Sequence, residues 1–329
     1  MKKTILLSAL AAMAASTSAL AQGVDPATAE IRSEDARRFT AVFEAANGTP
    51  TADQLQAGYL GGAGRGVEIF TPGRIENADH LAATVAVNVE AYRRAIEVCL
   101  PIAEAMNGEL REIYAGMHAL LPEAELPEIH VVFGAGNSGG TAGAGAQVLG
   151  LEVICANAET EEEIRRTFRK FFAHETVHTF QSWPETDVLA ADPLLAIALM
   201  EGTADFVAEL VTGEIPGPER EAWARANEDL VWQHFAADRV TIRDGFTIGE
   251  NGMQHSDIAR EAANRWYWNY GRAPEGWPYE MAYWTGRMIA QGYYENAGDR
   301  DQALRDLIAL QDPAAILAAS GLEDQATLH

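Results

Sequence analysis

Cysteine is scarce in this sequence of 329 residues, which contains only Cys99 and Cys155. Two cysteines exclude a disulfide-rich scaffold and a cysteine-rich zinc module. Basic residues are also few, since 24 Lys and Arg stand against 48 Asp and Glu and give a formal net charge of −24. Nucleic acids and anionic membrane surfaces attract basic patches, so this charge argues against both as partners.

Long apolar runs are missing as well, apart from one at the N-terminus that is too short to be a typical membrane span. There Lys2 and Lys3 precede an apolar stretch over residues 5–15, and Ala19 and Ala21 form a small-residue cleavage site. This pattern predicts a signal peptide over residues 1–21 and a periplasmic or secreted protein after cleavage near Ala21. No cysteine follows the cleavage site, so the sequence predicts no stable membrane anchor.

Cys99 and Cys155 are able to pair in such an oxidising compartment. The alternative is two buried free thiols, because sequence spacing does not fix the geometry that a disulfide needs. The sequence leaves both open.

The pattern of apolar residues predicts an α+β fold that is mostly helical, with a small β-sheet. Residues 27–46 and 77–120 are predicted to be helical, and residues 58–66 to form a tight surface loop. Two strands are expected, over 128–133 and 148–155, and the intervening residues 134–145 are expected to form a loop of small residues. The chain beyond is predicted to be helical almost to its end. We therefore expect one domain over residues 22–329, with an N-terminal helical part, a core and a C-terminal helical part (22–127, 128–213 and 214–329).

The sequence His174-Glu175-Thr176-Val177-His178 lies within a predicted helix and matches the HExxH signature of zinc hydrolases. Residues four apart share one face of a helix, so both imidazoles can bind one ion. Zinc lowers the pKa of a water that it binds, and Glu175 is placed to accept the proton of that water. The spacing therefore predicts one Zn²⁺ site with Glu175 as general base.

A third ligand is expected from the next predicted helix, which Asp192-Pro193 starts and in which Glu201 and Asp205 share a face. A buried carboxylate in so apolar a helix needs a partner, and a metal ion is a natural one. We predict Glu201 as the ligand and Asp205 as the acceptor for the outer N–H of a ligand histidine, His174 first. The reverse assignment of the two acidic residues is the alternative.

His174-Glu-x-x-His178 followed by Glu201-Gly-x-Ala-Asp205 resembles the gluzincin metallopeptidases, and more closely a family of exported bacterial proteins described as predicted zinc-dependent proteases. The similarity extends to Asn137-Ser-Gly-Gly140 and Tyr283-x-x-Gly286, and covers most of the chain from Tyr59 onward. It implies a zincin-like fold with a small sheet over the HExxH helix. It also implies an edge strand, 128–133 or 148–155, that binds extended peptide.

For each further candidate, ordinary packing or solvation is the alternative. Tyr283 is the first candidate for stabilising the oxyanion of a tetrahedral intermediate, because such sites usually need a Tyr or His donor outside the zinc helix. His255 is the second candidate. The low-ranked substrate-binding candidates are Asn137, Ser138, Gly139, Gln181, His255 and Arg287.

These features favour an exported zinc-dependent peptidase that acts on peptides or proteins. A zinc-binding protein without hydrolysis, such as a binding or chaperone-like module, is a second hypothesis. A metal hydrolase of non-peptide amides or esters is a third. Glu175 favours hydrolysis, since a purely structural zinc site does not need a carboxylate beside its first ligand.

Overall fold

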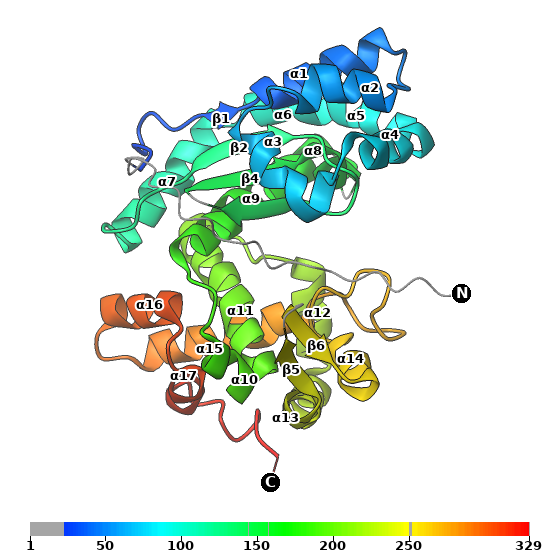
Figure 1. Cartoon of the computed structure of the whole chain (residues 1–329). Helices are drawn as coiled ribbons and strands as arrows, with labels where there is room; N and C mark the ends of the chain where they lie inside the picture. The colour runs from blue at the N-terminus through cyan, green and yellow to red at the C-terminus, as the bar shows by residue number, and fades with distance from the viewer. Residues whose placement is uncertain (1–22, 144, 157, 250–251, 329) are drawn as a thin grey trace. The chain divides into compact units, whose positions relative to one another are not determined.

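The computed structural model describes residues 23–143, 145–156, 158–249 and 252–328 (Figure 1). The predicted signal peptide, residues 1–21, lies outside the described residues. The chain divides into two compact units, Met1–Thr179 and Phe180–His329. The assignment of residues 22–329 to one domain stays a prediction.

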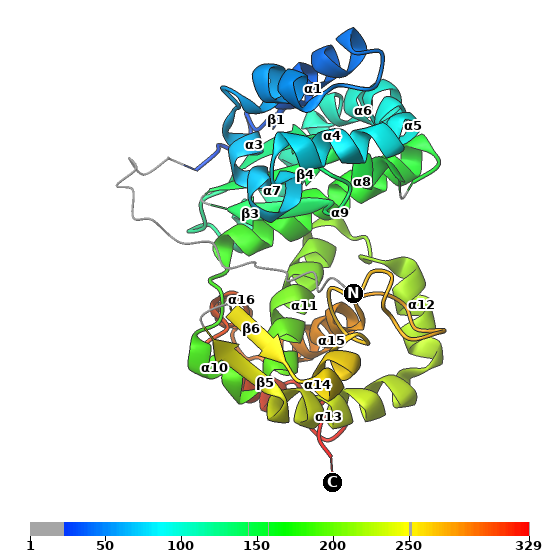
Figure 2. The ribbon, with the colours of Figure 1, turned by 45° about the vertical axis from the view of Figure 1, so that its right-hand side comes forward.

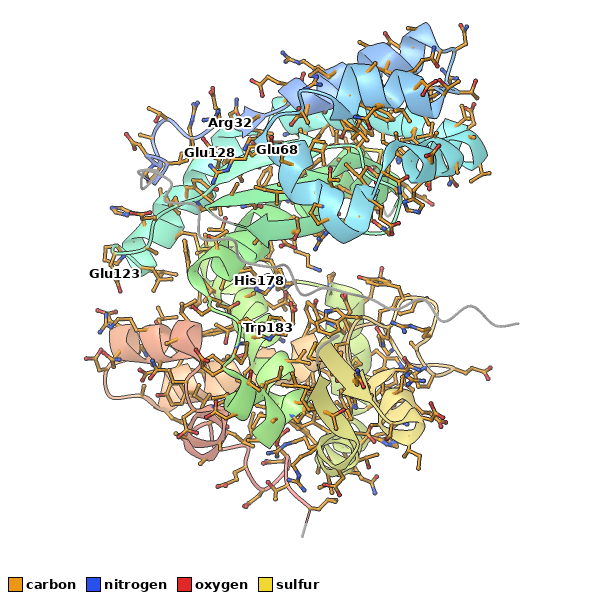
Figure 3. All side chains as sticks on the ribbon, in the orientation of Figure 1. Arg32, Glu68, Glu123, Glu128, His178 and Trp183 are labelled. Carbon is orange, nitrogen blue, oxygen red and sulfur yellow. A yellow bond between two sulfur atoms is a disulfide. The ribbon has the colours of Figure 1, made fainter. Side chains whose placement is uncertain are left out.

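The first unit contains a four-stranded sheet in the order β1-β2-β4-β3. The strands β1 (Ile31–Arg32), β2 (Glu128–Val132) and β4 (Ala146–Gly150) are parallel, and β3 (Gly140–Gly143) runs antiparallel to β4 at one edge. Strand β4 is buried along its whole length, as expected for a strand with neighbours on both sides. At the opposite edge, Arg32 and Glu128 form an ion pair of 2.8 Å, and both side chains are labelled in Figure 3.

Helices cover both faces of this sheet. Figures 1 and 2 show α1 and α3 over one face and α9 along the other. The amide of Gln147 on β4 donates to Phe172 O and Thr176 Oγ1 of α9, which fixes that helix against the sheet. The helices of this unit are α1 (Glu34–Ala45), α2 (Ala52–Leu55), α3 (Arg65–Phe70), α4 (Ala78–Val87), α5 (Val89–Arg94), α6 (Leu100–Glu104), α7 (Asn107–Leu120), α8 (Leu151–Ala156) and α9 (Glu161–Phe180), with short π-helical turns η1 (Gln56–Leu60), η2 (Thr71–Ile75) and η3 (Ala95–Cys99).

Several sequence predictions for this unit need correction. The predicted loop over 134–145 contains the edge strand β3, and the predicted strand over 148–155 ends at Gly150, where α8 begins. Neither β2 nor β4 is an edge strand, so the edge predicted for peptide binding was wrong. Residues 58–66, predicted as a loop, lie partly in η1 and α3. The first predicted helix begins at Glu34 rather than near residue 27.

Cys99 at the end of η3 and Cys155 in α8 form a disulfide, which decides the alternative that the sequence left open. The bond joins two helical segments that are 56 residues apart in the sequence. Both residues are almost fully buried.

The second unit is mostly helical and holds one two-stranded antiparallel hairpin, β5 (Phe246–Gly249) and β6 (Gly252–His255). The sequence analysis missed this hairpin. The helices are α10 (Thr186–Ala191), α11 (Pro193–Thr212), α12 (Pro218–Ala226), α13 (Glu228–Asp244), α14 (Asp257–Ala263), α15 (Met281–Asn296), α16 (Arg300–Ala309) and α17 (Pro313–Ala319). Together the described residues are mostly helical with a small sheet, which confirms the α+β class. No helix among them has the length and apolarity needed to cross a membrane.

Helices α11 and α15 of the second unit approach each other through glycine. A Cβ on Gly202 would lie 2.2 Å from the backbone nitrogen of Arg287, and a Cβ on Gly286 would lie 1.7 Å from the carbonyl oxygen of Ala198. No side chain fits in either place. The backbones of α11 and α15 therefore pack directly on each other at these two glycines. Glu201 directly precedes Gly202, and Tyr283 lies one turn before Gly286.

The two helices that carry the predicted metal ligands begin as their sequences indicate. At the start of α9, Glu163 N donates to Thr160 Oγ1 and Thr160 N donates to Glu163 Oε2, which is a capping box. At the start of α11, Asp192 accepts a hydrogen bond from Leu195 N, and Pro193 occupies the first turn. Gly213 ends α11 in a left-handed conformation.

Candidate metal centre

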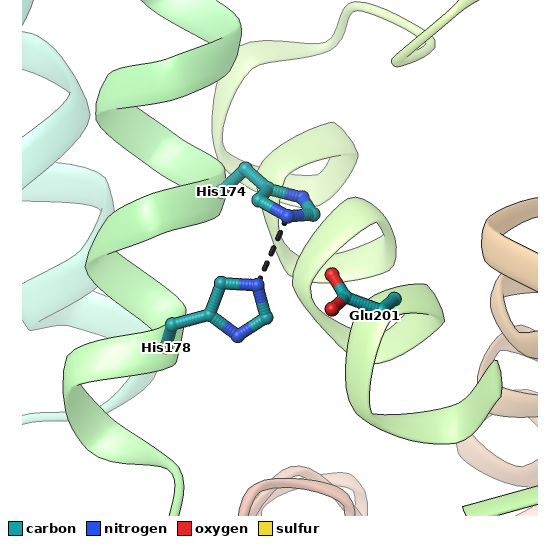
Figure 4. Close-up of side chains that lie close together, drawn as sticks. All are labelled: His174, His178 and Glu201. Carbon is teal, nitrogen blue, oxygen red and sulfur yellow. Dashed lines mark hydrogen bonds between the residues drawn. The ribbon is translucent and has the colours of Figure 1, made fainter. Parts of the chain in front are cut away.

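His174 and His178 lie one turn apart on α9 and point to the same side of the helix (Figure 4). Their Nε2 atoms are 3.0 Å apart. A Zn–N bond is about 2.0–2.1 Å long, so one ion can contact both nitrogens at this separation. The two rings are nearly perpendicular, with centroids 4.7 Å apart.

Glu201 on α11 completes a group of three possible ligands with these histidines. One ligand atom from each residue lies within 4.8 Å of the others. His174 is 5% and Glu201 6% exposed, so both polar groups have little access to solvent that could satisfy them. The structure thus brings together the three residues that the sequence predicted as ligands.

The donor set of this group fits zinc. Two imidazoles and one carboxylate are the ligands of a common type of catalytic zinc site, which keeps a position open for water or substrate. Softer sites would need thiolates, and both cysteines of this chain are consumed in the disulfide. Calcium and magnesium prefer oxygen ligands throughout, which two histidines do not provide.

Glu175 follows the first histidine and is 9% exposed. The backbone of the edge strand passes close to its carboxylate, because a Cβ placed on Gly140 would lie 2.9 Å from Glu175 Oε1. The same Cβ would lie 3.0 Å from the ring of Phe171, one turn earlier on α9. Glycine at this position therefore lets β3 approach the predicted general base.

The loop that leads into β3 contains the predicted substrate-binding residues Asn137, Ser138 and Gly139. Ser138 Oγ donates to Gly140 O at 2.7 Å, and Gly139 packs against the ring of Phe171. Asn137 Nδ2 donates to Arg74 O at 3.1 Å. The polar side chains of Asn137 and Ser138 are thus bonded within the chain, and their role in substrate binding stays a prediction.

Glu152 binds the start of the same loop. No role was predicted for this residue from the sequence. Its carboxylate accepts hydrogen bonds from Gly134 N at 3.0 Å and Gly136 N at 3.1 Å. Burial raises the pKa of Glu152, and these two backbone donors oppose that rise. An acidic residue in an apolar stretch was the signal that could have identified it.

Asp205 is fully buried one turn after Glu201 and forms an ion pair with Arg220 on α12. Arg220 also lies 3.8 Å from Glu280, at the start of α15. Neither Arg220 nor Glu280 was identified from the sequence. The hydrogen bond predicted between Asp205 and His174 stays a prediction.

Tyr283 on α15 is 8% exposed, and the guanidinium of Arg220 lies over its ring at 5.1 Å. Burial raises the pKa of Tyr283 well above its ordinary value, and the negative charges of Glu201, Glu280 and Asp205 raise it further. The phenol therefore stays protonated and remains a hydrogen-bond donor at any physiological pH. That is the form an oxyanion stabiliser requires.

The remaining candidates have structural surroundings of their own. His255 on β6 packs between the rings of Phe246 and Tyr267, and burial lowers its pKa. Gln181 donates to Met200 O at 3.0 Å, next to Glu201.

Arg287 was a candidate substrate-binding residue, and its contacts within the chain argue against that role. The side chain is 3% exposed and forms ion pairs with Glu209 and Glu221. Because two carboxylates of the chain already neutralise it, Arg287 holds α15 to α11 and α12. We do not retain it as a binding residue.

A scan for known protein families finds no match to this chain, and neither the curated proteins nor the solved structures include a significant match.

Proposed function

We propose that this protein is an exported zinc-dependent peptidase with a zincin-like fold. The observation that carries the proposal is the group of His174, His178 and Glu201, with Glu175 buried beside the edge strand. His174, His178 and Glu201 would hold the metal, which when bound lowers the pKa of a coordinated water. The proposed substrates are peptides or proteins.

Each remaining residue has a role that its surroundings support. Glu175 takes a proton from water and returns it to the leaving amine. It can do so because it directly follows the ligand His174 and is not itself one of the three proposed ligands. Tyr283, kept protonated by burial and nearby negative charge, donates a hydrogen bond to the developing oxyanion. His255 is the second candidate for that donor.

The edge strand supports peptide rather than small-molecule substrates. Gly150 N donates to Gly139 O, so these two residues form a hydrogen-bonded pair of the antiparallel ladder. Bonded and non-bonded pairs alternate, and Gly140 and Ala142 therefore direct their backbone N–H and C=O groups toward the open edge. An extended peptide can add to such an edge as a further strand. It would lie alongside Glu175.

Zinc analysis of the purified protein tests the metal site. We expect one zinc per chain, and His178→Ala should lose it, because removing a ligand from a three-residue site removes much of its affinity. His118→Ala, at an exposed position on α7, is the matched control and should retain zinc. Far-UV circular dichroism should show that both variants remain folded. Full zinc occupancy in His178→Ala would contradict the assignment.

Two glycines of β3 provide a test of the edge strand. In Gly140→Ala the new methyl group meets Glu175 and Phe171, so we expect the rate of peptide hydrolysis to fall about tenfold or more. In Gly143→Ala the nearest atom lies on Ile69 at 3.4 Å, an ordinary contact on the other face of the strand. This control should keep wild-type turnover. Equal rates for the two variants would show that β3 does not position Glu175.

The alternatives from the sequence lead to different outcomes of one assay. A zinc-binding module without hydrolysis would bind the metal and cleave nothing. A hydrolase of non-peptide amides or esters would cleave those compounds and leave a broad peptide library intact. Glu175 and the open edge of β3 favour the peptidase.

A further inference from the structure

Arg74, in the turn η2, is a half-buried cation that forms no ion pair within the part of the chain that the structure describes. Its Nε donates to Ser138 Oγ at 3.3 Å and its Nη1 to Pro72 O at 3.4 Å. The guanidinium also lies over the ring of Phe70 at 5.7 Å. Other arginines of this acidic chain, such as Arg220, do have a carboxylate partner.

The position of Arg74 links it to the proposed general base. Ser138, which accepts from Arg74, also donates to Gly140 O, and the Cβ position of Gly140 is 2.9 Å from Glu175. Burial lowers the pKa of Arg74, and the negative charge of Glu175 opposes that shift. Arg74 therefore lies within range of an electrostatic interaction with Glu175, although the two do not form a direct ion pair.

The turn that carries Arg74 is fixed in shape. Gly73 has a φ of 72°, a left-handed conformation that glycine adopts without strain. The carbonyl oxygen of Arg74 accepts a hydrogen bond from Asn137 Nδ2. Backbone and side chain of Arg74 thus both bind the loop that precedes β3, so its guanidinium is held in place where the edge strand begins.

Free donors remain on this guanidinium. An arginine has five N–H groups, and among the described residues only Nε and Nη1 of Arg74 make hydrogen bonds. Its planar fork suits a carboxylate, which it can bind with two parallel hydrogen bonds. A carboxylate that arrived there would also form the direct ion pair that Arg74 lacks among the described residues.

We infer that Arg74 binds a carboxylate of the substrate at the start of β3, beside Glu175. This inference rests on the proposed peptidase function, because it places the carboxylate on a peptide aligned with β3. The carboxylate belongs either to the C-terminus of the peptide or to an Asp or Glu side chain. Both sources offer the same chemistry to the guanidinium, and the experiment separates them.

Binding to four pools of fluorescein-labelled pentapeptides, measured by anisotropy, tests the inference. Two pools contain Ala, Leu and Phe and end in a carboxylate or an amide. The other two end in an amide and contain one Asp or one Asn. The protein is the full chain with Glu175→Gln and added zinc, which leaves the peptides intact. We expect one acidic pool to bind about tenfold more tightly than its neutral match, as a charge-assisted bond provides.

Arg74→Gln in the same background should abolish this preference while leaving the affinity for the neutral pools within a factor of about two. Arg111→Gln is the matched control, since Arg111 on α7 is exposed and donates to Ala29 O. It should keep the preference. Equal affinity for acidic and neutral pools, including no binding to any, would overturn the inference. So would an equal loss for all pools in Arg74→Gln, which would indicate a purely structural role.

The binding readout separates this inference from the proposed function. If the wild-type protein cleaves no peptide but the preference depends on Arg74, the peptidase proposal fails and the carboxylate site stands. If cleavage occurs and no preference is found, only the inference about Arg74 fails.

Discussion

Replacing Glu175 with Gln should leave zinc bound and lower the rate of peptide hydrolysis by about a thousandfold, within the range for general acid–base catalysis. The amide has nearly the shape of the carboxylate, so Gly140 and Phe171 keep their packing. It cannot take a proton from water. The measurement is initial rates on a broad library of fluorescence-quenched peptides, together with zinc analysis of the same samples.

Glu162→Gln is the control for this substitution. Glu162 lies in the first turn of the same helix, is exposed, and pairs with Arg169 at 2.9 Å. Losing the charge of Glu162 should change turnover by less than about twofold, because an exposed ion pair contributes little to stability. Wild-type turnover in Glu175→Gln with zinc retained would refute the mechanism. Loss of zinc in that variant would instead place Glu175 among the ligands.

The disulfide between Cys99 and Cys155 should have the largest effect on stability. It closes a loop of 56 residues, and the entropy of such a loop in the unfolded chain corresponds to about 4 kcal/mol. Reduction, or the double replacement of both cysteines by alanine, should lower the free energy of unfolding of the first unit by about that amount. Urea denaturation followed by far-UV circular dichroism measures it.

Tryptophan fluorescence provides an internal control for this experiment. All seven tryptophans lie after residue 180, so their fluorescence reports only the second unit. We expect that signal to shift less than the far-UV signal when the disulfide is removed. Adding reductant to the double alanine variant should shift neither the fluorescence transition nor the far-UV transition. A shift of less than about 1 kcal/mol in the far-UV transition would contradict the loop-entropy argument.

Local signals in the sequence predicted the elements that carry the metal site. The capping box of Thr160 and Glu163 depends only on neighbouring residues, and so does the start of α11 at Asp192 and Pro193. The spacing of His174 and His178 defines a shared helix face without knowledge of the rest of the fold. Such features can be identified from sequence because their interactions span a few residues.

Features that depend on distant contacts were missed. Strand β3 has the sequence Gly-Thr-Ala-Gly, in which only Thr141 favours a strand, and it forms because β4 pairs with it. Residues 151–155 alternate as a strand would, but Glu152 binds backbone N–H groups of Gly134 and Gly136 and the segment is helical. Arg74 meets Ser138 across 64 residues, and no local pattern marks it.

The glycine contact between α11 and α15 has a consequence for how the site tolerates change. Because main chain touches main chain at Gly202 and Gly286, the spacing of the two helices does not depend on any side-chain rotamer. Glu201 and Tyr283 therefore keep their relative position even when core side chains nearby are exchanged for others of similar volume. We expect conservative substitutions in the surrounding apolar core to change activity little. At Gly202 and Gly286, by contrast, even alanine does not fit.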